Sequence, residues 1–501
     1  MPSVSNLNYE KPVSLSSSQI ENIAIIGGGA SGAIILDSLL KEPNSNIKSI
    51  TVFERQQKLG GVWYFNPETI QTPNHIIKAG NINFQNDPQL ENPFHDHKYT
   101  RKLILPKSTQ ERFIQTPSYY GIKTNIIEKM MTYSDSNEWP VEGTAEDRKY
   151  VEGTVVQEYI ENYVGRNLDD PRVTLKLGST VEDVERVDRN DDSTTILPYR
   201  FKLTVREQFD DKQDYWYQQE FDSIVVATGH YHVPYIPHVP GLQEVQEKFP
   251  NVVQHAKFYR DSDSYKNKTV VVVGSRASGS DLAKFVAKEP GTTVYQSIRN
   301  LDRTKVLSTR PNVHSKPVIE NIQLSDDNNG ITVTFADGST LTNPDHIIYC
   351  TGYLFSYPFL DRLFDKSLTN EGITVSNLYQ HTFIINEPLI TIIGVPIDGV
   401  SFRVFEYQAI LLARYLTGKI ELVSRNKQLE WVKERYQSKG NSRLFHTIGV
   451  TDALEYARTL TQLGQVSEKT KVGREFPVMT DEDIAVYKAA GERLRKFWDE
   501  R

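Results

Sequence analysis

Short apolar runs bounded by glycines recur along the chain and predict buried strands. Two of these runs, residues 23–26 and 270–273, each lead into a glycine-containing turn and then into apolar residues at helical spacing. Strands without polar alternation suit a parallel sheet that is buried on both faces. The repeated strand–turn–helix pattern therefore predicts an α/β fold.

Other patterns predict the elements between and after these two units. Apolar residues at helical spacing in 155–164 predict an amphipathic helix. Asn125, with Glu128 three positions on, reads as a capping box that opens a helix over 126–131. A helical tail is expected over about 429–497. Four segments predict a small antiparallel meander that ends in a buried strand: 173–177, 201–205, 215–217 and 221–230.

The first glycine turn has the spacing of a dinucleotide site. Gly27, Gly29 and Gly32 follow the strand as G-x-G-x-x-G. The first glycine permits the tight bend, the second lets the backbone approach a pyrophosphate, and the third lets the helix lie close to the strand. Glu54 ends the next apolar run, 22 positions past Gly32. Because a carboxylate there accepts hydrogen bonds from ribose hydroxyls and repels a 2′-phosphate, this turn favours FAD or NAD over NADP.

The second turn departs from this pattern. It has Gly274 and Gly279, but Arg276 stands where the middle glycine is expected, so its side chain must leave the turn. The next strand, residues 292–296, leads to Arg299 and not to an acid. An arginine there suits the 2′-phosphate of NADPH, although an ordinary surface arginine has the same appearance.

The domain organisation follows from the two turns and the segments between them. Pro234, Pro237 and Pro240 predict a stiff crossover, and two strands that end in Thr-Gly predict the exit from the first domain and the return to it. We predict two Rossmann-like dinucleotide-binding domains, with the NADPH domain inserted in a discontinuous FAD domain. The expected bounds are a polar tail at 1–20, an FAD domain at 21–232 and 346–501, and an NADPH domain at 233–345.

Composition narrows the class of protein. The 501 residues carry 57 Lys+Arg and 64 Asp+Glu, a net charge of −7 that suggests no nucleic-acid surface. The single cysteine, Cys350, excludes an intrachain disulfide and the C-x-x-C pair of disulfide reductases. His95 and His97 have no cysteine nearby, so we expect loop histidines and no metal. No secretory, transit or transmembrane segment is recognisable, which favours a soluble, cytoplasmic protein.

The ordered set of motifs resembles the flavin-containing monooxygenases, a group of class B flavoprotein monooxygenases, and the fungal members most of all. The set comprises the first turn, Gly60-Gly61-Val62-Trp63, both Thr-Gly strand ends and the second turn, and it spans residues 23–416. The family motif F-x-G-x-x-x-H-x-x-x-(Y/F) is matched by Phe249, His255 and Tyr259, whereas Asn251 replaces its glycine. From spacing alone, residues 60–63 fit a turn with a core tryptophan as well as they fit backbone against a flavin.

The resemblance implies the cofactors FAD and NADPH and a set of site residues. A Thr-Asn step is matched by Thr124-Asn125, which implies that Asn125 lies near the flavin C4a as a catalytic group. Glu406 and Gln408 fit an E-x-Q-A step beside the flavin domain. The residues expected to bind the cofactors are Gly27, Gly29, Ala30, Ser31, Gly32, Glu54, Arg55, Gly61, Val62, Trp63, Thr124, Thr228, Gly229, Gly274, Arg276, Ser278, Gly279, Arg299, Thr351, Gly352 and Gln408.

The resemblance also implies the reaction. Hydride passes from NADPH to FAD, reduced flavin and O₂ form a C4a-hydroperoxide, and a small thiol, sulfide or amine takes up its outer oxygen. Three alternatives stay open. One is a Baeyer–Villiger monooxygenase acting on ketones, which Tyr259 disfavours because that group has tryptophan there. The second is an uncoupled NADPH oxidase or redox sensor, and the third is a non-catalytic binding protein. The substrate, a homo-oligomeric state and peripheral attachment to the endoplasmic reticulum are left open, and pocket walls are expected from 65–113 and from the tail.

Overall fold

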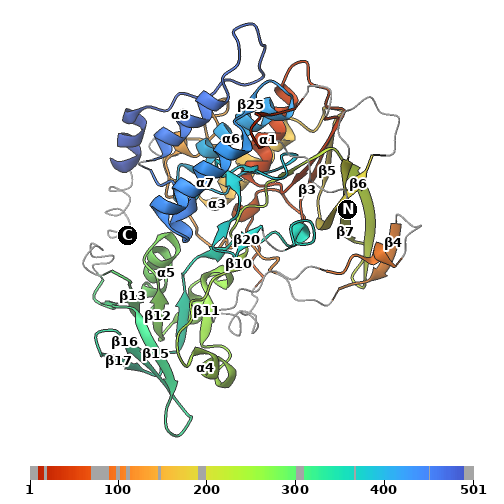
Figure 1. The fold of residues 1–501 in the computed structure, drawn as a ribbon. Coiled ribbons are helices and arrows are strands. Elements are labelled where there is room, and N and C mark those ends of the chain that lie inside the picture. The colour runs from red at the N-terminus through yellow and green to blue at the C-terminus, as the bar shows by residue number, and fades with distance from the viewer. Residues whose placement is uncertain are drawn as a thin grey trace.

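Two parallel sheets form the two halves of the molecule (Figure 1). The computed structural model describes residues 9–15, 20–68, 90–96, 102–108, 113–144, 148–189, 199–300, 310–365, 368–450 and 452–489. None of the helices in these ranges is long and apolar enough to cross a membrane.

The larger sheet has seven strands in the order β22-β23-β24-β9-β2-β3-β5. Its five parallel strands run from β24 to β5, and β22 and β23 add an antiparallel edge. Strands β2, β9 and β24 are almost wholly buried, as their apolar runs predict. The strands are β22 (Leu378–Tyr379), β23 (Phe383–Ile384), β24 (Ile390–Ile392), β9 (Ser223–Val226), β2 (Asn22–Ile26), β3 (Ser49–Phe53) and β5 (Val173–Lys176).

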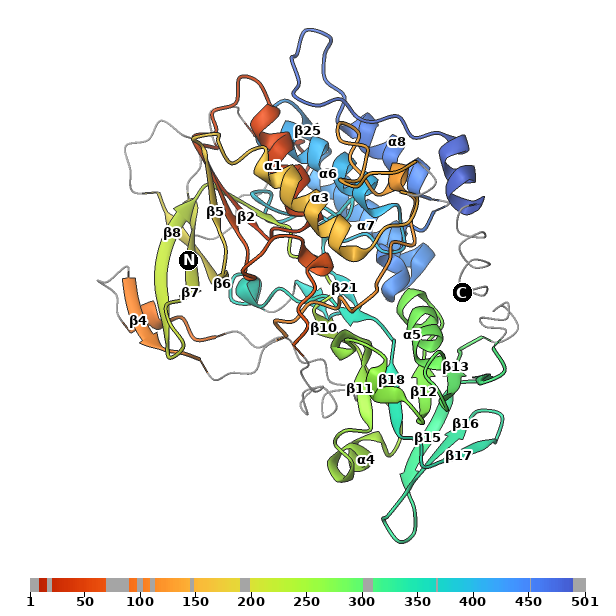
Figure 2. The same ribbon diagram turned by 180° about the vertical axis from the view of Figure 1, so that it is seen from behind.

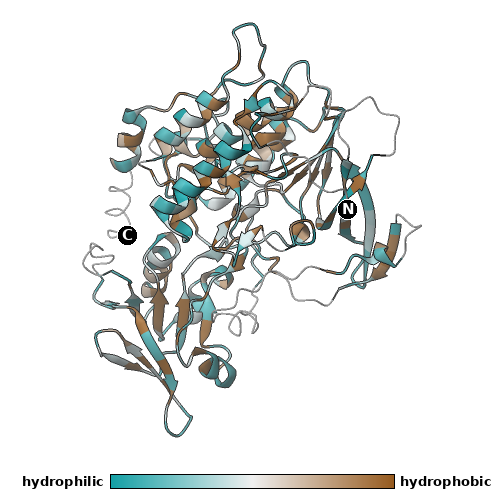
Figure 3. Ribbon diagram, viewed as in Figure 1, coloured by the Kyte–Doolittle hydropathy of each residue, from teal (hydrophilic) through white to brown (hydrophobic). Residues whose placement is uncertain are grey.

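Helices cover one face of this sheet and an antiparallel sheet lies on the other, so this half has three layers (Figure 2). The helices are α1 (Ala30–Lys41), α3 (Gly153–Gly165), α6 (Ser401–Leu416), α7 (Arg425–Lys439) and α8 (Ala453–Leu463). Helices α3, α6 and α8 turn their apolar sides inward, whereas α7 is mostly polar (Figure 3). The antiparallel sheet has the order β4 (Lys102–Pro106), β8 (Gln213–Phe221), β7 (Tyr199–Gln208) and β6 (Ser179–Asp188).

The smaller parallel sheet has five strands in the order β11-β18-β12-β13-β14. Helix α5 (Ala277–Ala287) packs against β12 and β13, and α4 (Leu242–Lys248) packs against a three-stranded antiparallel sheet. The parallel strands are β11 (Val253–His255), β18 (His346–Tyr349), β12 (Thr269–Val273), β13 (Thr293–Ser297) and β14 (Val313–Lys316). The antiparallel ones are β15 (Ile319–Leu324), β16 (Ile331–Phe335) and β17 (Thr340–Thr342).

Short paired strands connect these parts. β10 (Val233–Pro234) pairs with β19 (Tyr353–Leu354), so the two passages of the chain between the halves lie side by side. β20 (Thr369–Asn370) pairs with β21 (Thr374–Val375), and β1 (Val13–Ser14) pairs with β25 (Glu421–Leu422). The 3₁₀ helices are η1 (Gly61–Trp63), η2 (Pro93–His95), η3 (Glu128–Met130), η4 (Ala256–Phe258), η5 (Asp263–Tyr265), η6 (Pro358–Leu360) and η7 (Arg443–His446).

Four predictions about strands and about the N-terminal segment are wrong. The strand at 173–177 pairs with β3 in the parallel sheet and is not part of the meander. The strand at 223–226 lies between β2 and β24, also in the parallel sheet. The strand at 346–349 lies in the smaller sheet beside β12, so the chain returns to the larger half only after this strand and not at 346. The segment 1–20 is not a polar tail throughout, because Val13 pairs in β1 and Ile20 is buried.

Candidate cofactor and substrate site

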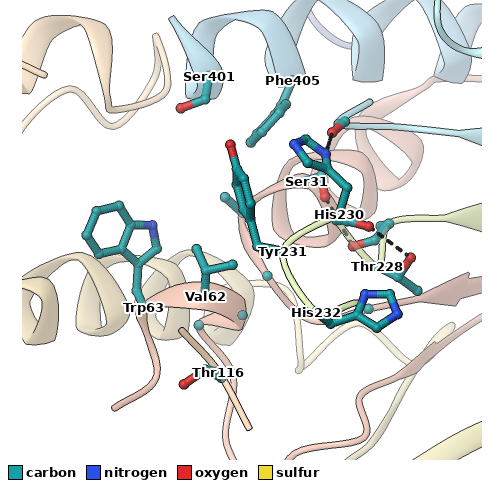
Figure 4. A pocket seen from close by; sticks show the side chains of 18 of the residues that line it. Ser31, Val62, Trp63, Thr116, Thr228, His230, Tyr231, His232, Ser401 and Phe405 are labelled. Atoms are coloured by element: carbon teal, nitrogen blue, oxygen red, sulfur yellow. Dashed lines mark hydrogen bonds between the residues drawn. The ribbon is translucent and has the colours of Figure 1, made fainter. Parts of the chain in front are cut away.

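A cavity of about 570 Å³ opens at the carboxyl-terminal edge of the larger sheet. This edge is where α/β proteins bind ligands, and the volume is in the range of cofactor pockets. The ends of β2, β3 and β9 form its floor, and η1, the loop before α6 and the C-terminal segment form its walls (Figure 4). The lining includes Gly27, Gly29, Glu54, Gly61, Trp63, Thr116, Asn125, Thr228, His230, Tyr231, Ala277, Asp398, Ser401, Phe405 and Tyr487.

The glycines of the first turn are required by space and by backbone conformation. Gly27 has φ +115, and a Cβ there would lie 2.4 Å from the Ala227 carbonyl oxygen. A Cβ at Gly32 would lie 2.0 Å from the Gly27 carbonyl oxygen, so only glycine lets α1 approach β2 this closely. The N-terminus of α1 has no acidic residue in its first turn and faces the cavity, an arrangement that suits an anionic group.

Gly29 and Gly61 form a narrow cradle between the first turn and η1. A Cβ on Gly29 would lie 3.3 Å from the Gly61 Cα, and a Cβ on Gly61 would lie 3.0 Å from the Gly29 Cα. Both glycines line the cavity, so backbone and not side chain faces a ligand there. Residues 60–63 were open to two interpretations, a turn with a core tryptophan and backbone that faces a ligand. The structure supports the second, because Trp63 lies half-buried at the cavity wall and not in the core.

Glu54 lies at the end of β3, where the first turn requires an acid. Its carboxylate is buried and accepts hydrogen bonds from the backbone N–H of Gly28 (2.7 Å) and of Gln56 (2.8 Å). Burial raises the pKa of Glu54, and the two N–H donors oppose that rise. Each carboxylate oxygen keeps a second lone pair for a ligand hydroxyl. Together, the acid, the cradle and the helix N-terminus fit the ribose and pyrophosphate of FAD.

The second turn has the same skeleton as the first. A Cβ on Gly274, with φ +124, would lie 2.7 Å from the Cys350 carbonyl oxygen, and a Cβ on Gly279 would lie 2.4 Å from the Gly274 carbonyl oxygen. Arg276 has φ −83 and ψ −168, nearly the same backbone as Gly29 at φ −85 and ψ −165. The arginine is tolerated because its φ is negative and its side chain, 69% exposed, leaves the turn.

The acid of the first turn has an apolar counterpart in the second. The N–H of Gly27 bonds to the carbonyl of the last β3 residue, and the N–H of Gly274 bonds in the same way to Ser297. Ile298 is therefore the structural equivalent of Glu54, and exposed Arg299 follows it. Without a carboxylate there, the electrostatic barrier to a 2′-phosphate is removed. This agrees with the NADPH preference expected from Arg299, and the structure adds that Ile298 is the residue equivalent to Glu54.

The predicted site residues divide into three groups. Twelve line the cavity: Gly27, Gly29, Ala30, Ser31, Glu54, Arg55, Gly61, Val62, Trp63, Asn125, Thr228 and Gly229. Gly274, Arg276, Ser278, Gly279 and Arg299 lie around the second turn. Gly32, Thr124, Thr351, Gly352 and Gln408 are outside the cavity lining.

The residues outside the lining support others that belong to it. The side-chain carbonyl of Gln408 accepts from the N–H of Gly394 at 3.0 Å, and Gly394 lines the cavity. Thr124 exchanges two hydrogen bonds with Val151 directly behind Asn125. Gly352 packs against Arg443, and its carbonyl lies 3.1 Å from Nε2 of His255 in the family motif.

The expected helix after Asn125 is absent, so the capping-box prediction is wrong. Asn125 lies in a bend, and only the 3₁₀ helix η3 follows it. The Glu128 carboxylate, which a capping box would use, accepts instead from the Trp139 N–H at 2.8 Å and from Arg148 at 3.2 Å. Asn125 therefore has no capping role, and its exposed side chain faces the cavity.

Several lining residues were missed by sequence reasoning. Tyr487 lines the cavity from the C-terminal segment, as expected in general terms for the tail, whereas most of 65–113 lies outside the described residues. Sequence reasoning could have identified Ser401 and Asp398, because the Asp398-Gly399 step predicts a turn just before the helix. Gln115, Thr116 and Tyr231 carry no local signal, because only the fold brings them to this edge.

Two titratable side chains of the cavity lining are held in their neutral forms. Burial lowers the pKa of His230 to about 3, so its imidazole is neutral. Its Nδ1 donates to the Gly394 carbonyl at 3.1 Å (Figure 4). Burial raises the pKa of Tyr231, which keeps that phenol protonated. The described lining thus suits chemistry whose reactive group comes from a cofactor.

A separate group of possible metal ligands is already occupied by cations. His95, Asp183 and Glu185 bring one ligand atom each within 4.8 Å of one another. Asp183 accepts from Arg362 at 2.7 Å and from Asn92 at 2.8 Å, and Glu185 pairs with Lys202 at 3.2 Å. His97 lies outside the described residues. We assign no metal here.

Comparison with known proteins agrees with this geometry. Residues 24–231 match the family described as FAD-NAD(P)-binding, and residues 313–489 match Flavin-binding monooxygenase-like. Residues 216–386 match Pyridine nucleotide-disulphide oxidoreductase, although one cysteine cannot form an intrachain disulfide.

Curated relatives and solved structures extend these matches to nearly the whole chain. Flavin-containing monooxygenase ustF2 of Aspergillus flavus is 27% identical over 463 residues, covering 86% of this chain and 89% of the relative. Flavin-containing monooxygenase FMO GS-OX-like 9 of Arabidopsis thaliana is 27% identical, covering 85% and 82%. S-allyl-L-cysteine S-oxygenase from Allium sativum has the same fold, with a TM-score of 0.69, 21% identity and coverage of 96% and 94%.

Fold and site together define a flavoprotein with two dinucleotide-binding turns. The chain is related to the flavin-containing monooxygenases over most of its length, and FAD and NADPH are the cofactors that these relatives and the FAD-NAD(P)-binding match indicate.

Proposed function

We propose that the protein uses NADPH and O₂ to S- or N-oxygenate small soft nucleophiles such as thiols, sulfides and amines. The observation that carries this proposal is the composition of one cavity. It joins the first nucleotide turn to Asn125 and also to Ala277, which directly follows Arg276 in the second turn. When bound, FAD reduced by NADPH supplies the activated oxygen, and the protein must orient the reactants and exclude water.

We assign the holding of FAD to the first turn, to the Gly29–Gly61 cradle and to Glu54. The side-chain amide of Asn125 has two N–H donors and is exposed on the cavity side. In this proposal it donates to an oxygen that develops charge during the reaction. The aromatic side chains of Trp63, Phe402 and Phe405 line the same cavity and keep it poor in water.

The class of substrate is proposed from what the reaction asks of the protein. Because His230 is neutral and Tyr231 stays protonated, the proposal places activation in the cofactor and assigns the protein no deprotonation of the nucleophile. Thiols, sulfides and amines meet this condition. Some of the relatives carry names that fit it, among them the garlic S-oxygenase. The absence of a disulfide and the mild net charge support a cytoplasmic location as part of the proposal.

The test is a substrate panel scored for coupling. Purified FAD-loaded enzyme is given NADPH with a thiol, a sulfide, a tertiary amine or a cyclic ketone, and NADPH loss, peroxide and oxygenated product are quantified together. We expect product close to one per NADPH with at least one sulfur or nitrogen compound. Ester formation from the ketone alone identifies a Baeyer–Villiger enzyme, and one peroxide per NADPH with every compound identifies an oxidase.

A further inference from the structure

An ion pair joins the second nucleotide turn to the wall of the cavity. The guanidinium of Arg276, the residue before α5, contacts the carboxylate of Asp398, in the loop before α6. The two side chains are 69% and 40% exposed, so the pair lies at the surface and can exchange partners. Asp398 has φ +59, a backbone region uncommon for residues other than glycine and asparagine.

This pair lies where a dinucleotide would meet the second turn. Arg276 occupies the place of the middle glycine, the position at which the backbone approaches a pyrophosphate. Helix α5 begins one residue later and has no acidic residue in its first turn. The Arg276 backbone matches that of Gly29, so the turn itself is formed, and the arginine side chain is paired with Asp398.

Asp398 belongs to the cavity as well as to the ion pair. Together with Gly399, Ser401 and Tyr487 it lines the cavity at the start of α6, and Ala277, next to Arg276, lines the same cavity. If Arg276 leaves Asp398 for another partner, the loop before α6 loses a contact, and this loop borders the cavity assigned to FAD.

We propose that Arg276 exchanges Asp398 for the pyrophosphate of the bound nicotinamide dinucleotide, and that Asp398 weakens dinucleotide binding by holding the guanidinium in the meantime. The inference rests on the proposed function, because it requires NADPH at the second turn. Arginine and a phosphate form charge-assisted, often bidentate hydrogen bonds, which outweigh an exposed Arg–Asp pair. The ion pair thus sets the affinity of the turn for dinucleotides.

The choice of phosphate distinguishes Arg276 from Arg299. The pyrophosphate is common to NADP⁺ and NAD⁺, whereas only NADP⁺ carries the 2′-phosphate. Loss of the Arg276 charge therefore weakens both dinucleotides by the same factor. Loss of the Arg299 charge weakens NADP⁺ and leaves NAD⁺ unchanged.

Equilibrium binding to the oxidised, FAD-loaded enzyme tests the exchange without turnover. NADP⁺ and NAD⁺ are titrated by calorimetry into wild type, Asp398→Asn, Arg276→Gln and the double variant. Asparagine is chosen because it tolerates a left-handed backbone and so preserves the loop. Asp326→Asn, in the exposed loop between β15 and β16, is the control for net charge, and Arg299→Gln is the control for the 2′-phosphate. The flavin absorbance of each variant checks that the FAD site is intact.

The expected result has three parts. Asp398→Asn binds both dinucleotides about two- to fivefold more tightly, the range that the loss of an exposed ion pair allows. Arg276→Gln binds both about tenfold more weakly. In the Arg276→Gln background, Asp398→Asn gives no gain, because there is no guanidinium to release.

Two results would overturn the exchange. A gain from Asp398→Asn that persists in the double variant means plain repulsion of phosphate by Asp398. Equal binding by wild type, Asp398→Asn and Arg276→Gln means that Arg276 and Asp398 do not act on the dinucleotide. If wild type binds no NADP⁺, the proposed function fails instead, so the two failures are distinguishable.

Discussion

The backbone N–H of Gly28 donates a 2.7 Å hydrogen bond to the buried carboxylate of Glu54. This bond ties the end of β3 to the turn that precedes α1, and a second bond from Gln56 fixes the carboxylate from the other side. The acid is therefore oriented before any ligand arrives, which limits the ordering cost of binding.

Removal of this carboxylate is expected to release the flavin. Glu54→Ala leaves the Gly28 N–H buried without a partner, at a cost of about 1–3 kcal/mol, and also removes the acceptor for ribose hydroxyls. We expect purified Glu54→Ala to lose most of its FAD, measured as the ratio of absorbance at the flavin and protein bands. Glu54→Gln, which keeps one acceptor oxygen and the shape, is expected to retain more. Full flavin retention by Glu54→Ala contradicts the assignment.

Asn125 is expected to act on oxygen transfer and not on cofactor binding. Its side chain is exposed on the cavity side and has no capping bond, so Asn125→Ala and Asn125→Asp should fold and keep FAD. Loss of one preorganised donor typically costs about 10²-fold in rate. We expect product per NADPH to fall sharply while peroxide rises by the same amount. Unchanged coupling in both variants rules out this role.

Gly32 should tolerate no side chain. A Cβ there lies 2.0 Å from the Gly27 carbonyl oxygen, so Gly32→Ala must push α1 away from β2 at a cost of about 1–3 kcal/mol. We expect a melting temperature several degrees lower and weaker FAD retention. Gly165→Ala, at the end of α3 with nothing within 4 Å and no positive φ, is the matched control. It is expected to be neutral or slightly stabilising.

Arg474 is expected to anchor the C-terminal segment to the larger half. Its guanidinium, 5% exposed, contacts Asp37 at 2.6 Å, Asp135 at 2.9 Å and Glu406 at 2.5 Å. Arg474→Met leaves buried carboxylates without this partner, and such losses cost about 3–5 kcal/mol. Arg458→Met removes the exposed 3.8 Å pair with Asp481 and should change the melting temperature little.

This loss of stability should depend on pH. Burial raises the pKa of Asp135, but hydrogen bonds from Arg474 and Lys41 and the attraction of Arg474 hold that pKa well below its ordinary value. A carboxyl with a lowered folded pKa adds stability above its unfolded pKa of about 3.9, and this contribution is lost as pH falls toward the folded value. The difference in melting temperature between wild type and Arg474→Met should thus be largest near pH 7 and shrink below about pH 4. A difference that grows on acidification contradicts this account.

Local patterns were sufficient for the nucleotide units. Apolar runs and glycine spacing predicted β2, α1, β12 and α5, because each unit is short and its requirements are satisfied within about 30 residues. The helix predicted at 155–164 was equally clear from its periodicity, and the structure has it as α3. Most residues predicted to bind FAD line one cavity for the same reason.

Non-local pairing was beyond the sequence. The strand at 173–176 has the pattern of an antiparallel strand, but its position is set by β3, more than a hundred residues earlier in the chain. Residues 346–349 looked like a return to the first domain, because Thr-Gly follows both this strand and β9. The equivalence of Ile298 and Glu54 could be recognised only from the strand registers of the two parallel sheets. The Arg276–Asp398 ion pair could be recognised only once the two halves of the molecule were placed relative to each other.

Isotope incorporation tests the central claim most directly. The FAD-loaded enzyme is supplied with NADPH, ¹⁸O₂ and the best substrate of the panel, and the product is analysed by mass spectrometry. A flavin monooxygenase places one ¹⁸O atom in each product molecule for each NADPH oxidised. Product without ¹⁸O, or NADPH oxidation that appears entirely as labelled peroxide, would contradict the account.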